Sequence, residues 1–148
     1  TPHPPHSGPE HTPAPRGTSA GAEPGCSAAT IGLVASSYGV IAIDEAQFFD
    51  DGLADVCARL VEEGLTVFVA GLDRNFKGEP FGPMAELMAL SDDVMKLRAV
   101  CMRCRSLEGS MTQRLIDGKP ASRNSRVILI GAAETYEARC RNCHELPD

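Results

Sequence analysis

Four cysteines stand in two Cys-x-x-Cys pairs in the second half of the sequence, Cys101 with Cys104 and Cys140 with Cys143. A two-residue spacer lets both thiolates of a pair reach one cation while backbone N–H groups donate to the sulfurs. A redox pair, two disulfides or four unrelated thiols are the alternatives, but two such pairs in one chain favour a metal. Four thiolates leave no open coordination position, so we predict one structural zinc ion.

A second candidate site follows the apolar run Val40–Ile43, which ends directly on the carboxylates of Asp44 and Glu45. An acid at the carboxyl end of a buried strand is typical of the phosphate site of P-loop nucleotide hydrolases and kinases, where it lies near a Mg²⁺-bound phosphate. The second acid can act as a base. Taken alone the pattern is weak, because many strands of α/β proteins end in an acid that only caps the next helix.

The elements that must position these carboxylates are those of an α/β fold. Val40–Ile43 and Thr66–Ala70 are β-branched, apolar runs of the kind found in buried strands of a parallel sheet. Between them, apolar residues at helical spacing predict an amphipathic helix, with N-caps offered by Asp50 and Asp51 and with Gly64 as its C′ residue. Strand, helix and strand form a βαβ unit, which should be parallel and right-handed.

The rest of the sequence is less regular. Residues 73–83 are predicted to form a loop long enough to be functional, Met84–Leu90 a short helix, and residues 94–100 a third strand. Residues 105–125 are polar and are expected to be irregular, and Val127–Ile130 is predicted as a last strand. The two cysteine pairs bracket this region, so we expect a separate small lobe.

Charge and composition narrow the range of partners. Fourteen Lys and Arg against twenty Asp and Glu give a net charge of -6, which argues against binding nucleic acid or an anionic membrane. This also disfavours a zinc-ribbon nucleic-acid module. No apolar run approaches the roughly 20 residues that span a bilayer, and the first residues show no secretory signal. We expect no membrane and a cytoplasmic location, with an organelle as the alternative.

Sequence blocks around both candidate sites resemble the cellular, zinc-containing thymidine kinases, in family order from about Tyr38 to the C-terminus. The blocks are Asp44–Phe49, Val69–Asp73, Phe76–Gly82, Lys96–Leu97, Ala99–Cys101, Thr112–Leu115 and Tyr136–Cys143. The resemblance implies an incomplete P-loop NTPase-like parallel sheet with a small zinc-binding lobe. It also implies transfer of the γ-phosphoryl group of ATP, with Mg²⁺, to the 5′-hydroxyl of thymidine, giving thymidine monophosphate as a DNA precursor.

The same resemblance implies roles for individual residues. Asp44 would help to hold the hydrated Mg²⁺, and Glu45 would accept the proton of the 5′-hydroxyl as general base. The residues implied at the thymine pocket are Phe48, Leu72, Phe76, Thr112 and Tyr136, and the last strand would bind the pyrimidine edge through its main chain at Val127, Leu129 and Gly131.

Ordinary packing is the alternative for part of this set. Without the family context, Phe48, Leu72 and Phe76 are core residues. Arg114 either supports the segment that closes over the nucleoside or lies on a solvated face.

One motif of the family is missing. A Gly-x-x-x-x-Gly-Lys-Ser/Thr loop, which would hold the triphosphate, should precede the acidic strand, but the sequence has only Gly118-Lys119, downstream and followed by Pro120. We therefore expect a truncated or misassembled kinase with impaired ATP binding. The alternative is a non-catalytic nucleoside-binding or assembly relative.

The expected organisation has three parts. Residues 1–37 form a disordered Pro/Gly-rich tail, residues 38–100 a partial P-loop-type α/β kinase domain, and residues 101–148 the zinc-binding lobe with the nucleoside-closing loop. Members of the family are commonly homotetramers, so we expect a homo-oligomer.

Overall fold

The structure is a computed structural model that describes residues 27–31, 38–128 and 134–148. The predicted tail lies outside these ranges except at residues 27–31. Leu129 and Gly131, which were predicted to contact the pyrimidine, also lie outside them.

A βαβ unit forms the first part of the described chain. Strand β1 (Val40–Ile43) pairs in parallel with β2 (Thr66–Val69), and helix α2 (Leu53–Glu62) connects them. The register places Val40 opposite Thr66 and Ile43 opposite Val69. The predicted strands, helix and parallel pairing are confirmed, and the protein has a mixed α/β fold.

Helix α2 follows its apolar pattern, with one correction at its start. Leu53, Val56 and Leu60 are buried as the spacing predicts, and the chain leaves the helix through Gly64 at a φ of 88°, which suits glycine. The N-cap is Gly52 and no side chain caps the helix, so the prediction of an aspartate cap was wrong. Asp50 instead accepts a hydrogen bond from the Gly52 N–H at 3.1 Å, because the chain turns before the helix begins.

Helix α3 (Met84–Leu90) forms where it was predicted and packs against α2. Together with the inner sides of β1 and β2, the two helices enclose one apolar core. Its buried members are Ala28, Ile43, Ala46, Leu53, Ala54, Val56, Cys57, Leu60, Met84 and Leu87. This core holds the carboxyl ends of β1 and β2 in place.

A second, antiparallel sheet forms the C-terminal part. Its order is β4 (Lys119–Pro120), β3 (Met111–Ile116) and β5 (Glu134–Arg139). The prediction that residues 105–125 are irregular was wrong. Strand β3 was not predicted, because its sequence shows no alternation of apolar and polar residues. Its buried positions include the polar side chains of Gln113 and Arg114.

The prediction of a strand at residues 94–100 was also wrong. This stretch is an extended connection with a single bridge, from Ala99 to Gly109. Its apolar residues have no sheet to pack on, and Met95 and Leu97 are more than 80% exposed (84% and 82%). Of the predicted strand 127–130, residues 127 and 128 are not in a strand and the others are outside the described ranges.

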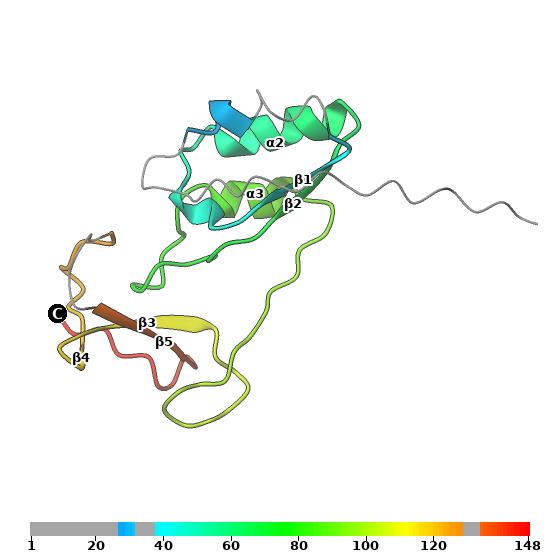
Figure 1. Cartoon of the computed structure of the whole chain (residues 1–148). Helices are drawn as coiled ribbons and strands as arrows, with labels where there is room; N and C mark the ends of the chain where they lie inside the picture. Colours follow the sequence, from blue (N-terminus) through cyan, green and yellow to red (C-terminus); the bar gives the residue numbers. More distant parts are fainter. Residues whose placement is uncertain (1–26, 32–37, 129–133) are drawn as a thin grey trace, which may run out of the picture.

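Figure 1 shows the two groups of elements, β1, β2, α2 and α3 in one and β3, β4 and β5 in the other, joined by the long connection after α3. We call the second group, with the two Cys-x-x-Cys turns, the cysteine lobe (residues 101–148). None of the helices in the described ranges has the length and apolar character needed to cross a bilayer.

Candidate functional site

The four cysteines of the two pairs meet at one point of the cysteine lobe. All four sulfur atoms lie within 4.8 Å of one another, and the sulfurs of Cys104 and Cys140 are 3.7 Å apart. Zinc–sulfur bonds of about 2.3 Å in a tetrahedron require sulfurs roughly 3.8 Å apart, whereas a disulfide requires about 2.05 Å. The cysteines are free thiols, and as a set they could hold a zinc ion.

Two tight turns position the thiols. In the first, the Arg105 N–H donates to the Cys101 carbonyl at 2.9 Å, and in the second, the Cys143 N–H donates to the Cys140 carbonyl at 3.0 Å. The second turn follows directly on β5. The Met102 N–H donates to the carbonyl of Ala138 in β5 at 2.8 Å, so the first turn is tied to the strand that carries the second.

The thiols differ in how readily they ionise. Backbone N–H groups, first that of Cys104, lower the pKa of Cys101 to about 6, and the Ser106 hydroxyl lowers the pKa of Cys104. The neighbouring thiol of Cys140 raises the pKa of Cys143 to about 12. Four thiols this close cannot all ionise without a cation among them, because the thiolates would repel one another. Four thiolates around one cation are the donor set that a thiolate-bound metal requires.

The acidic pair stands at the carboxyl end of β1, where the chain turns sharply. Glu45 has a φ of 53°, in the left-handed region that few residues other than glycine adopt, and its N–H donates to Asp44 Oδ1 at 2.8 Å. The following N–H, of Ala46, donates to the Ala70 carbonyl at 3.0 Å and fixes the turn to the end of β2. Both carboxylates are exposed. Backbone strain of this kind, worth of order 1–3 kcal/mol, is concentrated at functional sites.

A buried glutamine that was not predicted as a site residue lies beside this pair. Gln47 is 3% exposed and belongs to a 3-10 turn, η1 (Ala46–Phe48). Its Nε2 donates to Glu45 Oε2 at 2.5 Å, and its Oε1 accepts from the Leu72 N–H at 3.0 Å. The signal available in the sequence was a lone amide inside an otherwise apolar stretch.

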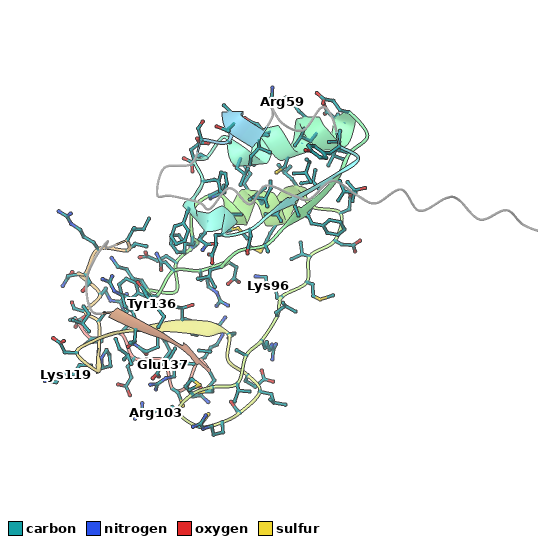
Figure 2. The ribbon with its side chains drawn as sticks, in the orientation of Figure 1. Arg59, Lys96, Arg103, Lys119, Tyr136 and Glu137 are labelled. Atoms are coloured by element: carbon teal, nitrogen blue, oxygen red, sulfur yellow. The ribbon has the colours of Figure 1, made fainter. Side chains whose placement is uncertain are left out.

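A cavity of about 1170 Å³ lies between the βαβ part and the cysteine lobe. Its walls come from the end of β2, helix α3, the connection after α3, and strands β3 and β5. Three of the residues predicted at the thymine pocket line it, namely Leu72, Thr112 and Tyr136. In Figure 2, Lys96 and Tyr136 lie in the region between the two groups of elements, and both line the cavity.

Two ion pairs share the carboxylate of Asp73 at the wall of this cavity. Lys96 Nζ lies 3.0 Å from Asp73 Oδ2, and Arg74 Nε lies 3.4 Å from the same oxygen. Burial raises the pKa of Asp73, but the hydrogen bond from Lys96 and the charges of Arg74 and Lys96 outweigh it and hold that pKa below its usual value. The pair between Lys96 and Asp73 ties the connection after α3 to the end of β2.

Other predicted pocket residues do not border the cavity. Phe48 is half-buried and makes an edge-to-face contact with Phe81, with ring centroids 5.6 Å apart. Phe76 is 3% exposed, and the Arg114 guanidinium lies 5.1 Å from its ring centroid. Val127 is half-buried in the segment after β4.

Arg114 is a buried link between three segments. The solvated-face alternative is wrong, because Arg114 is 1% exposed. From β3 its guanidinium reaches Phe76 in the 73–83 loop and donates to the carbonyl of Arg126, the residue before Val127. His144 Nε2, from the second cysteine turn, lies 2.9 Å from the Phe76 carbonyl.

A comparison with known protein families gives one further finding. The family model described as thymidine kinase matches residues 19–144, most of the 148 residues. The matched span contains both cysteine pairs, the acidic pair, Gln47 and every residue that lines the cavity.

Proposed function

The chain belongs to the thymidine kinase family, and on that premise we propose that its cavity binds thymidine and that Glu45 serves as base in phosphoryl transfer to the 5′-hydroxyl. The observation that carries the proposal is the link through Gln47. Leu72 lines the cavity, and its N–H is bonded to the same amide that holds the Glu45 carboxylate. A candidate base and a candidate binding wall therefore share one support.

The chemistry of the cavity walls suits a nucleoside. Tyr136 offers an aromatic face, Leu72 an apolar contact, and Thr112 a hydroxyl that can donate to or accept from a polar base edge. A few polar groups among apolar walls are typical of small-molecule sites. We extend the proposal to Phe48, Phe76 and the main chain at residues 127, 129 and 131 on the family resemblance alone.

The two carboxylates have separate roles in this scheme. Glu45 accepts the proton of the 5′-hydroxyl, the hydroxyl oxygen forms a bond to the γ-phosphorus of ATP, and the bond from that phosphorus to the β-phosphate oxygen breaks to leave ADP. Asp44 is an exposed, hard oxygen ligand at the strand end and would help to hold the Mg²⁺ that accompanies ATP.

The cysteine cluster has a structural role in the proposal. Zinc held by Cys101, Cys104, Cys140 and Cys143 has no free coordination position, so it supplies cross-linking and no reaction step. It would hold the two turns together and, through β3 and β5, place Thr112 and Tyr136 at the cavity.

The 148 residues contain no Gly-x-x-x-x-Gly-Lys-Ser/Thr segment. We propose that on their own they bind triphosphate very weakly while keeping the nucleoside and zinc sites. The alternative is a relative that binds nucleosides without catalysis. A homo-oligomer in the cytoplasm, with thymidine and ATP as substrates, completes the proposal.

Calorimetry with thymidine and a phosphorylation assay with ATP and Mg²⁺ test these statements separately. We expect saturable thymidine binding by the purified chain, and no turnover near the roughly 1–100 s⁻¹ of ordinary kinases. Any residual turnover should be lost in Glu45→Gln and kept in Glu62→Gln, a matched change on the exposed side of α2.

Two outcomes would overturn parts of the proposal. Failure of thymidine to bind the folded chain would remove the nucleoside site. Turnover at ordinary kinase rates would contradict the weak triphosphate binding, and turnover that survives in Glu45→Gln would remove the base.

A further inference from the structure

The amide of Gln47 is oriented by its two partners. The ionised Glu45 carboxylate can only accept a hydrogen bond, so the Gln47 Nε2 must face Glu45. The Leu72 N–H can only donate one, so the Gln47 Oε1 must face Leu72. An amide supplies one donor group and one acceptor in a single plane, and no apolar side chain of the same length can bridge these groups. A buried amide costs free energy unless both ends are paired, and here both are.

The surrounding backbone leaves room for this side chain and little more. A Cβ on Gly71 would stand 2.7 Å from Gln47 Oε1, and a Cβ on Gly82 would stand 2.3 Å from the Gln47 carbonyl oxygen. Gly82 also has a φ of 50°. Two glycines from separate segments therefore admit Gln47, one beside its side chain and one beside its main chain.

We propose that Gln47 is a positioning residue for the reaction. It holds the Glu45 carboxylate and the Leu72 main chain at one separation, so that the base and one wall of the nucleoside cavity move as a unit. The inference rests on the proposed function, since it assigns Gln47 to the same site. It acts through Glu45 and Leu72 and needs no contact of its own with the substrate.

The chain provides a matched control for the test. Its other glutamine, Gln113, is also buried, at 1% exposed, and its amide is likewise paired at both ends. Nε2 donates to the carbonyls of Glu145 (2.9 Å) and Arg114 (3.2 Å), and Oε1 accepts from the Glu145 N–H (2.8 Å). Gln47→Met and Gln113→Met therefore remove the same chemistry from two places, and only the first should affect Leu72.

The measurement is amide hydrogen exchange by NMR on the full chain, with thymidine binding by calorimetry. In Gln47→Met we expect Leu72 N–H exchange to rise roughly tenfold, about the worth of one hydrogen bond, with the Ala70 N–H, which donates to Ile43, unchanged. Thymidine affinity should fall by a similar factor. In Gln113→Met the Leu72 exchange should stay at the wild-type rate.

A spectroscopic signature separates positioning from simple packing. With only two glutamines in the sequence, the Nε2 signals of Gln47 and Gln113 can be told apart, and Glu45→Ala should shift the first and leave the second. Unchanged Leu72 exchange in Gln47→Met, or an unmoved Gln47 signal in Glu45→Ala, would overturn the inference. If wild-type chain fails to bind thymidine, the proposed function fails, and these two NMR results still decide whether Gln47 links Glu45 to Leu72.

Discussion

The βαβ part and the cysteine lobe are held together by different forces. Every member of the apolar core identified among the described residues, from Ala28 to Leu87, belongs to the first. Among the described residues of the lobe, the largest fully buried side chains are those of Arg114, Gln113 and Cys101. The first part therefore depends on the hydrophobic effect, and the second on hydrogen bonds and on its cysteine cluster.

This difference predicts which part depends on metal. A three-stranded sheet with polar buried residues removes little apolar surface from water, and small domains of this kind usually need a metal or disulfides. The βαβ part packs two helices on a sheet around an apolar core, and its described residues include no group that could hold a metal ion. Loss of zinc should therefore disorder one part and spare the other.

The largest expected effect is that of removing a metal ligand. Cys140→Ser should abolish zinc binding and the exchange protection between β3 and β5, because zinc binding in structural sites is worth about 10–16 kcal/mol. Protection in α2 should remain. Cys57→Ser is the control, since Cys57 lies in the apolar core and outside the four-cysteine cluster, and burial raises the pKa of its thiol. Loss of zinc in Cys57→Ser, or intact β3–β5 protection in Cys140→Ser, would contradict this contrast.

A core truncation tests the other side of the comparison. Leu53 is 0% exposed, so Leu53→Ala should lower the free energy of unfolding of the βαβ part by about 2–5 kcal/mol. Denaturant unfolding monitored at α2 measures this. Zinc content should stay at the wild-type level, and its loss in this variant would show that the two parts do not fold separately.

Arg114→Met tests the buried polar link in the lobe. Losing a charge-assisted bond to the Arg126 carbonyl and the contact with Phe76 should cost about 1.5–3 kcal/mol. Thermal unfolding gives the magnitude, with Arg59→Met on the exposed side of α2 as the control. Equal unfolding temperatures of Arg114→Met and Arg59→Met would mean that the contacts of Arg114 do not stabilise the lobe.

The smallest effect is expected at the ion pair between Lys96 and Asp73, which ties the connection after α3 to the end of β2. Lys96→Met should cost less than about 1 kcal/mol, because Lys96 is largely exposed. The lowered pKa of Asp73 sets the pH dependence. The difference in the free energy of unfolding between the wild type and Lys96→Met should be at its full value above roughly pH 4, the ordinary pKa of an aspartate. It should vanish as the pH falls through the lowered pKa of Asp73 in the folded protein. A difference that persists at pH 2 would assign the effect to something other than Asp73.

Local pattern was sufficient for the βαβ part and failed in the lobe. The sequence pattern was enough to predict strand Val40–Ile43 and helix Leu53–Glu62, because their apolar residues follow the pattern typical of each element. Strand Met111–Ile116 does not, since its buried positions carry an amide and a guanidinium whose partners, such as Glu145, come from far along the chain. At residues 94–100 the error was the opposite one. Apolar residues predicted a strand, but in the structure they are exposed and form none.

The candidate site shows the same division. Spacing was enough to predict that the four cysteines come together, because two-residue spacers are a local geometry. The link through Gln47 could not be predicted, because it joins the end of one strand to the end of another through partners 2 and 25 residues away. Which aromatic residues face the cavity and which are buried likewise depends on tertiary packing.

The most direct test of the central claim is metal content measured on purified chain whose β3–β5 amide protection is recorded on the same sample. The account predicts close to one zinc per chain, lost on treatment with a strong chelator together with the β3–β5 protection, while protection in α2 persists. A chain that keeps its β3–β5 protection without metal would contradict it.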